Sequence, residues 1–251
     1  MNLNLEGVRA LITGGSRGIG FATASAFAQA GAHVSICARD PDQIEVARKA
    51  LAKHGGKVHA ACCDMADADA IRAYVHDAAA ALGGIDVLVN NAGGKASGNT
   101  DDDWIRSIDI DLMATVRTIA AARPYLAKSD RARIINISSR TAFRPSPDTQ
   151  PYGALKAALH QLTQSQAAEL AADGINVNCI APGSTDFPGS WWDQCRTDNP
   201  ELYKKTMESF PFGRIGREDD ITGPILFLSS SLAGWITGQT ILVDGGQTLN
   251  G

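Results

Sequence analysis

The chain has 251 residues, of which 44% are hydrophobic and 20% are charged, and its formal net charge is −4. This composition is typical of a globular protein with one large α/β domain or two small ones. The slightly acidic balance and the lack of a basic block argue against a nucleic-acid partner, and no apolar run is long enough to span a membrane.

The five cysteines are odd in number and form no CxxC pair, so we expect reduced and mostly buried thiols. The first residues show no charged-then-apolar signal pattern, and together these features predict a cytoplasmic protein. His59, Cys62 and Cys63 are close in sequence. Adjacent side chains of a strand point to opposite faces, however, so we expect no metal site here.

The first predicted strand, residues 8–12, is followed at once by the segment TGGSRGIG and then by an Ala-rich helical stretch. A glycine-rich turn between a strand and a helix predicts a phosphate-binding loop, and a plain glycine turn is the alternative. Gly14 would allow the sharp turn, and Gly18 would let backbone approach a pyrophosphate. Gly20 would let the helix lie close to the sheet. The open N–H groups at the helix start attract an anion.

The second predicted strand, residues 33–38, ends in Arg39-Asp40-Pro41. An acidic residue at this strand tip binds the ribose hydroxyl of NAD, whereas an arginine accommodates the extra phosphate of NADP. Asp40 is better interpreted as the N-cap of the next helix, with Pro41 in its first position. Arg39, helped by Arg17, therefore favours NADP over NAD.

Strands and helices continue to alternate along the rest of the chain. Further helices are expected at about residues 41–54, 67–82, 102–127, 152–172 and 218–230, and further strands at 58–62, 85–89, 133–138, 175–180 and 240–243. This alternation predicts one α/β domain over residues 1–251, with a parallel sheet wound on both faces and a ligand at the carboxyl ends of its strands. Residues 184–216 are long for a connection and contain several aromatic side chains. They predict a partly helical lid over a substrate cleft, or a surface insertion packed by its own aromatics.

A possible proton-transfer site lies after the fifth strand, where Ser139 precedes a loop and then Tyr152-Gly-Ala-Leu-Lys156. Residues four apart on a helix share one face, so the lysine ammonium group would lie close to the phenol and favour its phenolate form. A tyrosine tuned in this way exchanges protons near neutral pH. The Tyr-x-x-x-Lys spacing alone is more often an ordinary solvated face, and it gains weight from the dinucleotide-type loop upstream.

Several motifs occur together, in order and at familiar spacing: TGGSRGIG, Asp64, NNAG, Ser139, YGALK, Pro182-Gly183 and VDGG. Over essentially its whole length the chain resembles the short-chain dehydrogenase/reductase family, including its 3-oxoacyl thioester reductases. The resemblance implies a single Rossmann-type domain with a seven-stranded parallel sheet. It also implies a homotetramer that pairs through the long helices at residues 102–127 and 152–172.

The resemblance further implies hydride transfer between NADP and a small-molecule carbonyl or alcohol substrate. Ser139 would orient the substrate carbonyl, Tyr152 would transfer the proton, and Lys156 would bind the nicotinamide ribose. Asn90 would support the central strand, and Asp64 would hold the adenine amino group. The implied cofactor contacts are Gly14, Ser16, Arg17, Gly18, Ile19, Gly20, Arg39, Asp64, Met65, Asn91, Ala92, Gly93, Tyr152, Lys156, Pro182, Gly183 and Thr185.

Two positions depart from the family pattern. Asp111 stands in place of the catalytic asparagine, and an ionised aspartate accepts hydrogen bonds but cannot donate them. Phe187 replaces a threonine that often meets the nicotinamide carboxamide, with Thr185 or Ser184 as substitutes nearby. These departures motivate the alternative of a dinucleotide-binding sensor or scaffold without turnover.

Substrate identity is only hinted at. Lys95, Arg140 and Arg144 flank the expected cleft and favour an anionic substrate, although loop arginines are more often simply solvated. The tandem Trp191-Trp192 favours a flat or apolar substrate part.

Overall fold

The computed structural model describes residues 3–94 and 98–250 as one α/β unit. Its strands are β1 (Arg9–Thr13), β2 (His33–Ala38), β3 (Val58–Cys62), β4 (Val87–Asn90), β5 (Arg133–Ile137), β6 (Asn176–Pro182) and β7 (Thr240–Val243). They form one seven-stranded sheet in the order β3-β2-β1-β4-β5-β6-β7, and all pairs are parallel. The predicted doubly wound parallel sheet is confirmed.

The strand order reverses beside β1, where Ala10 pairs with Val34 of β2 on one side and with Val87 of β4 on the other. The chain connections on the two sides of this point run in opposite directions. A crevice therefore opens at the carboxyl ends of β1 and β4, which is where open α/β sheets bind ligands.

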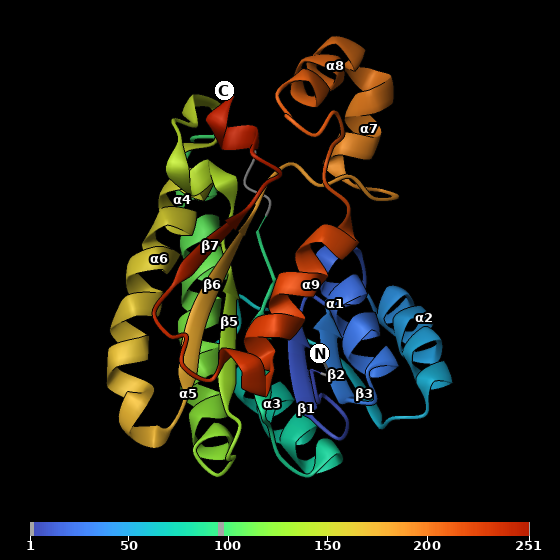
Figure 1. Cartoon of the computed structure of the whole chain (residues 1–251), viewed down its shortest axis with the longest axis vertical. Coiled ribbons are helices and arrows are strands. Elements are labelled where there is room, and N and C mark those ends of the chain that lie inside the picture. Colours follow the sequence, from blue (N-terminus) through green and yellow to red (C-terminus); the bar gives the residue numbers. More distant parts are fainter. Residues whose placement is uncertain (1–2, 95–97, 251) are drawn as a thin grey trace.

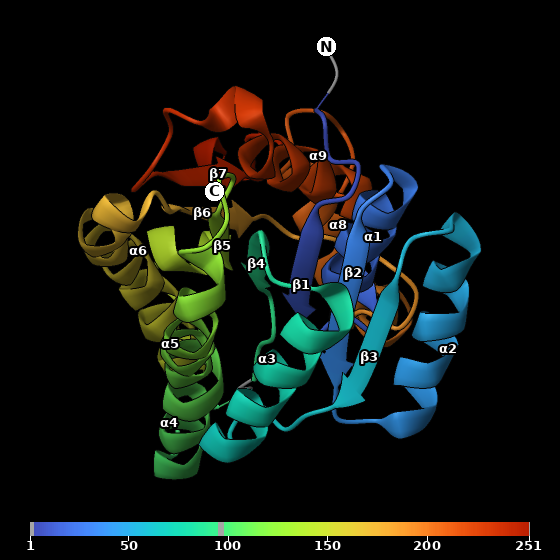
Figure 2. The same cartoon turned by 90° about the horizontal axis from the view of Figure 1, so that it is seen from below.

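Helices cover both faces of the sheet (Figures 1 and 2). They are α1 (Gly18–Gln29), α2 (Pro41–Leu51), α3 (Ala68–Leu82), α4 (Asp101–Ser107), α5 (Ala114–Leu126), α6 (Gln150–Leu170), α7 (Trp191–Asp198), α8 (Pro200–Glu208) and α9 (Glu218–Ser229). One buried cluster joins α1, α2 and α9 to the sheet, and a second joins α3, α5 and α6 to the opposite face. Among the described residues no helix is both long and apolar enough to cross a bilayer.

The single helix predicted for residues 102–127 is wrong in one respect. A π-helical turn, Ile108–Met113, separates α4 from α5. The wider turn accommodates an extra residue, and it places Asp111 in the interior, where it is 1% exposed. Side-chain periodicity does not reveal such a turn, which packs against α6 in the folded chain.

The segment at residues 184–216 is partly helical, as predicted, and its helices α7 and α8 lie beyond the carboxyl edge of the sheet (Figure 1). Asp186 ties the segment together. Its carboxylate accepts hydrogen bonds from the hydroxyl groups of Ser190, at 3.0 Å, and Tyr203, at 3.1 Å, and it pairs with Arg196. These contacts hold α7 and α8 as one small layer.

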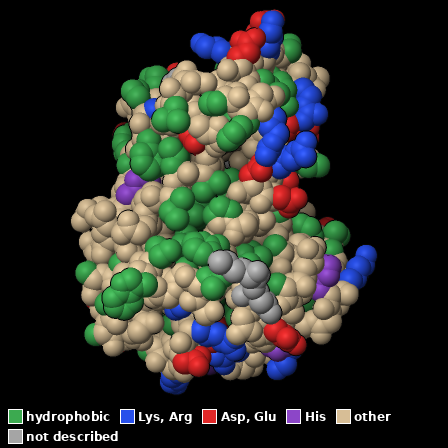
Figure 3. Space-filling view, in the orientation of Figure 1, with side chains coloured by type: hydrophobic (Ala, Val, Ile, Leu, Met, Phe, Trp, Pro, Cys, Tyr) green, Lys and Arg blue, Asp and Glu red, His purple; other side chains and the backbone are tan. Residues whose placement is uncertain are grey.

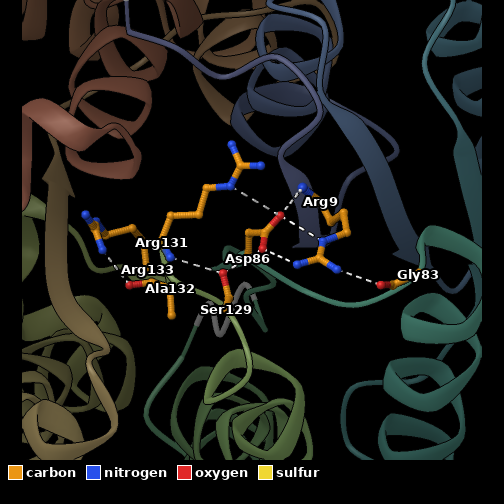
Figure 4. A network of polar contacts seen from close by, with 7 residues as sticks. All are labelled: Arg9, Gly83, Asp86, Ser129, Arg131, Ala132 and Arg133. Atoms are coloured by element: carbon orange, nitrogen blue, oxygen red, sulfur yellow. Dashed lines mark hydrogen bonds and ion pairs between the residues drawn. The ribbon is translucent and has the colours of Figure 1, made fainter.

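At the opposite, amino edge of the sheet, a polar network surrounds Asp86 (Figure 4). The carboxylate accepts hydrogen bonds from the backbone N–H and the Nε of Arg9, both at 2.9 Å, and from the Ser129 hydroxyl at 2.6 Å. Arg131 adds a longer ion pair at 4.0 Å. The network joins the start of β1 to the segments that precede β4 and β5, far from the carboxyl edge.

Candidate active site

A cleft of about 1270 Å³ opens at the carboxyl ends of the strands. It is lined by the glycine loop, by the ends of β2, β5 and β6, by the start of α6, and by α7 and α8. All seventeen residues implied as cofactor contacts line it, and so does Ser139. Of the described residues predicted for the site, Asp111 and the supporting Asn90 do not line it.

The glycine loop has the geometry predicted for it. Gly14 and Gly18 adopt left-handed φ angles of +66° and +55°, which other residues rarely adopt. A Cβ atom on Gly20 would lie 2.3 Å from the Gly14 carbonyl oxygen, so only glycine lets α1 approach the loop this closely. The first turn of α1 has neither a side-chain cap nor an acidic residue. This cradle of open N–H groups fits a pyrophosphate.

Thr13, at the end of β1, connects the glycine loop to the segment NNAG. Its hydroxyl accepts hydrogen bonds from the backbone N–H groups of Asn91, at 3.0 Å, and Ala92, at 3.1 Å. The Asn91 amide in turn donates to the carbonyl oxygens of Thr13 and Gly14, at 2.9 and 3.1 Å. Asn91 is therefore held by the protein itself and shapes the floor of the cleft. The residues around Thr13 in the chain do not predict this role, because its partners lie 78 and 79 positions away.

Asn90 heads a buried chain of side-chain hydrogen bonds. Its amide donates to Asn136 at 2.9 Å, and the Asn136 amide donates to the Thr163 hydroxyl at 2.9 Å. This chain links β4, β5 and α6, the three elements that carry the predicted cofactor and proton-transfer residues. The expected support of the central strand by Asn90 is observed.

At the far end of the cleft, Arg39 follows the tip of β2. Asp40 caps α2, because one of its oxygens accepts the backbone N–H groups of Asp42 and Gln43 at 2.9 and 3.0 Å. The predicted N-cap is confirmed, and it directs this carboxylate toward α2. The guanidinium groups of Arg39 and Arg17 have no ion-pair partner within the described part of the chain, so both are available to a phosphate.

Tyr152 and Lys156 lie on the first turns of α6, as predicted, with the Lys156 Nζ 5.6 Å from the centre of the Tyr152 ring. Lys156 is 4% exposed. Its ammonium group donates to the carbonyl oxygen of Ile137 at 3.0 Å and lies 3.5 Å from the Asp111 carboxylate. These contacts hold the cation beside the Tyr152 ring.

The structure separates the roles of the two serines that follow β5. The Ser138 hydroxyl is buried and bonds both the carbonyl oxygen of Lys156, at 2.7 Å, and Nε2 of His160, at 2.8 Å. Among the described residues, the Ser139 hydroxyl bonds only to its close neighbour Thr141. It lies 2.5 Å from the Thr141 hydroxyl oxygen and accepts from the Thr141 backbone N–H at 3.2 Å. Ser138 therefore anchors α6, whereas Ser139 keeps hydrogen-bonding capacity for a ligand.

Asp111 does not line the cleft, but it contacts Lys156, which does. One carboxylate oxygen accepts the Gly94 N–H at 3.1 Å and faces Lys156, while the other is buried without a hydrogen-bond partner among the described residues. The Asp111 carboxylate and the Ile137 carbonyl oxygen both contact the Lys156 Nζ. The geometry makes Asp111 a positioning residue behind Lys156.

Phe187 lies against the glycine loop, since a Cβ atom on Gly18 would meet the end of its ring at 2.5 Å. The two hydroxyl groups suggested as substitutes for the missing threonine have partners in the protein. The Thr185 hydroxyl donates to the Gly183 carbonyl oxygen at 3.1 Å, and the Ser184 hydroxyl accepts from the Gln247 amide at 3.0 Å.

The outer part of the cleft combines aromatic and cationic side chains. The rings of Trp191 and Trp192 pack edge to face, with centroids 4.5 Å apart, and both line the cleft together with Arg140 and Arg144. The predicted third cation, Lys95, lies outside the described residues.

Comparisons with known proteins agree with this geometry. Residues 14–248 match the family model described as Enoyl-(Acyl carrier protein) reductase. The chain is 35% identical to the 3-oxoacyl-acyl-carrier-protein reductase of Chlamydia muridarum over 98% of this chain and 100% of that protein.

Two solved structures have the same fold. A Sinorhizobium meliloti protein described as a short-chain alcohol dehydrogenase superposes with a TM-score of 0.92 at 35% identity, covering 100% of both chains. A Burkholderia cenocepacia short chain dehydrogenase in complex with NADP has a TM-score of 0.89 at 32% identity, covering 97% of this chain and 99% of that one.

Proposed function

Because the chain belongs to the short-chain dehydrogenase/reductase family, we propose that it is an NADP-dependent oxidoreductase acting on a carbonyl or secondary alcohol substrate. The observation that carries this proposal is the placement of Ser139, Tyr152 and Lys156 in the same cleft as the glycine loop. A proton donor and a dinucleotide cradle in one cleft are what carbonyl reduction requires.

In the proposed reduction, the glycine loop and Lys156 would hold NADPH, and the cofactor would supply the hydride for the carbonyl carbon. The Tyr152 hydroxyl gives its proton to the carbonyl oxygen, which becomes the alcohol. Lys156 stabilises the phenolate that remains, and the Ser139 hydroxyl donates a hydrogen bond that orients the carbonyl. Oxidation of an alcohol reverses each of these steps.

The preference for NADP rests on Arg17 and Arg39, which are both available at the far end of the cleft. Asp40 is occupied as the cap of α2, so it does not take the place of the ribose-binding acid typical of NAD enzymes. The similar Burkholderia cenocepacia structure with NADP supports this choice. Titrations with NADPH and NADH test it. The Arg39→Asp variant should lose selectivity for NADPH, and equal affinities in the wild type would contradict the proposal.

The substrate we propose is a ketone, with a 3-oxoacyl thioester as one candidate because of the similarity to the Chlamydia muridarum reductase. The direct test is to mix the protein with NADPH and a panel of ketones and to follow the absorbance of the reduced cofactor. Consumption of NADPH that depends on the ketone is the expected result.

A second candidate function is that of a dinucleotide-binding sensor or scaffold without turnover. Two observations favour it: the Phe187 ring on Gly18, and the aspartate at position 111 in place of the usual asparagine. Binding of NADPH with no consumption across the whole ketone panel would select this alternative.

We further propose a cytoplasmic homotetramer, as expected from the resemblance. The long helices α5 and α6 offer one pairing surface. A second apolar surface lies on and just after α9, where Phe227 is 38%, Leu232 44% and Trp235 100% exposed. Hydrophobic side chains also gather across the middle of the face shown in Figure 3. Light scattering on the purified protein gives the test, and a monomeric mass would contradict this proposal.

A further inference from the structure

Two arginines stand beside the reactive groups. Arg140 directly follows Ser139 in a short 3-10 turn, Arg140–Phe143, and Arg144 follows that turn. Both side chains line the cleft that also contains Tyr152. Arg140 is half-buried and Arg144 is exposed. Positive charge is therefore placed within a few residues of the expected position of the substrate carbonyl.

Neither guanidinium group is neutralised by the described part of the chain. No carboxylate of residues 3–94 or 98–250 lies within ion-pair distance of either one, and the Arg144 Nε lies 3.5 Å from the Pro145 carbonyl oxygen. Arg9, Arg196 and Arg214, by contrast, each have a paired aspartate.

The surroundings of Arg140 also disfavour its charge. Burial, and then the nearby Arg144 guanidinium, lower the pKa of Arg140, while Asp244 acts on it weakly in the opposite direction. Asp148 is a further acid that lines the cleft, and it forms no ion pair with either arginine. Partial burial of an uncompensated cation costs free energy, and an anionic ligand would offset that cost.

We propose that Arg140 and Arg144 form a subsite for a carboxylate group of the substrate, so that the enzyme acts on oxo acids. This inference rests on the proposed function and deepens it. The planar guanidinium fork matches the two oxygens of a carboxylate, and two forks side by side can hold it while the ketone lies against Ser139 and Tyr152.

The aromatic residues of the lid narrow the substrate class further. Trp191 and Trp192 of α7 and Leu202 of α8 line the cleft, and the edge-to-face packing of the two indoles leaves ring surface available. Trp191 remains 54% exposed. An aryl or other flat apolar group would cover this surface. The substrate class is therefore an aryl-substituted oxo acid.

A phosphate of the cofactor is the other anion that two arginines could bind. The cradle for the pyrophosphate is the glycine loop, and the free cations at the adenosine end are Arg17 and Arg39. Arg140 instead follows Ser139 directly in the chain. Its position beside Ser139 assigns it to the substrate end of the cleft.

The test uses two aryl oxo acids, benzoylformate and benzoylpropionate, each paired with its methyl ester. Calorimetric titration into the protein, with and without NADP, measures binding without relying on turnover. The wild type should bind at least one acid roughly tenfold to hundredfold more tightly than its ester, because a charge-assisted hydrogen bond stabilises a complex more than a neutral one does.

Arg140→Gln should reduce this acid-to-ester ratio strongly, Arg144→Gln should reduce it less, and the double variant should bring it close to one. Lys205→Gln is the matched control, because it removes a positive charge from α8 at a position that does not line the cleft. It should leave the ratio unchanged.

Three results would overturn the subsite. The wild type could bind acids and esters equally or not detectably, or the preference for acids over esters could survive in the double variant. The third is a loss of NADPH affinity in Arg140→Gln that is larger than the loss of acid affinity. Parallel turnover assays separate the two proposals. Selective acid binding without reduction of any ketone would count against the oxidoreductase and leave the subsite standing. Reduction of ketones without a preference for acids would support the oxidoreductase and count against the subsite.

Discussion

Two buried aspartates at opposite edges of the sheet have opposite environments. Asp86, at the amino edge, is 0% exposed, and hydrogen bonds from Arg9 and Ser129 engage both of its carboxylate oxygens (Figure 4). Asp111, near the carboxyl edge, is 1% exposed, and its contacts within the described residues are the Gly94 N–H and the Lys156 ammonium group. Its second oxygen has no partner among the described residues.

The difference separates polar groups that stabilise the fold from polar groups that remain available to a ligand. A carboxylate whose donors are all supplied by the protein contributes to the fold and has no capacity left for a ligand. The carboxyl edge differs, because four of its arginines have no ion-pair partner in the described residues. They are Arg17, Arg39, Arg140 and Arg144. Buried polar atoms without a partner also occur elsewhere among the described residues, for example Nε of Arg133. The unpaired cations at the carboxyl edge favour a binding site because they line one cleft.

The largest expected effect comes from a substitution at the carboxyl edge that leaves the amino edge unchanged. Tyr152→Phe removes the proton donor and should lower kcat/KM by about a hundredfold to ten-thousandfold, the usual range for general acid catalysis. NADPH affinity and the free energy of unfolding should change little, because the phenyl ring is kept. Steady-state kinetics, fluorescence titration and urea unfolding give the three measurements. Turnover that survives in this variant would show that another residue donates the proton.

A substitution at the amino edge should lower the free energy of unfolding and leave the activity of the folded enzyme unchanged. Asp86→Asn removes the charge that compensates Arg9, and the loss of one partner of a buried pair should cost roughly 2 to 4 kcal/mol of unfolding free energy. The kcat/KM of the folded enzyme should be retained. Glu45→Gln is the control, because its pairs with Arg48 and Lys49 lie on the surface. A large kinetic defect in folded Asp86→Asn protein would refute the separation of the two edges.

The same network predicts a dependence of stability on pH. Burial raises the pKa of Asp86, but hydrogen bonds from Arg9 and Ser129 outweigh it, so the pKa in the folded state is lower than normal. The stabilisation is fully present above the unfolded value of about 3.9 and is lost as the pH falls through the lower folded value. Urea unfolding between neutral and acidic pH checks this prediction. The free energy of unfolding should fall less steeply with decreasing pH in Asp86→Asn than in the wild type. Identical slopes in the two proteins would contradict it.

A smaller effect is expected from Phe187→Thr. The ring lies against Gly18, so its removal should open the phosphate cradle and tighten NADPH binding by roughly threefold to tenfold, a change of about 1 kcal/mol. Phe212→Thr is the matched control, since that ring is 79% exposed. Weaker binding in Phe187→Thr would mean that the ring supports the cofactor site.

The smallest expected effect is that of Asp111→Asn. Asparagine keeps an oxygen to accept the Gly94 N–H, and it adds a donor at the position of the unpaired oxygen. Activity should be kept or should increase by roughly threefold, because the Lys156 contact with Ile137 remains. A collapse in kcat would instead show that the charge at position 111 has a role of its own.

Local patterns predicted much of this molecule. The bounds of β2 and β3 match the predicted residues 33–38 and 58–62, because glycines, Asp40 and Pro41 mark the neighbouring turns and helix ends. Tyr152 and Lys156 lie on one helix, as their spacing predicted. The π-helical turn at Ile108–Met113 and the tie from Thr13 to Asn91 were not foreseen, since both depend on residues distant in the chain.

By itself, the sequence determined the order of strands and helices, the glycine loop and the placement of Tyr152 and Lys156 on one helix, because periodicity, turn residues and short spacings act over a few positions. Only the tertiary structure decided which polar groups are satisfied. Asp86 meets Arg9 across 77 positions of the chain, whereas Asp111 is turned toward Lys156 and keeps one oxygen unpaired. The pairing of buried charges depends on which segments the sheet brings together, and no local pattern records it.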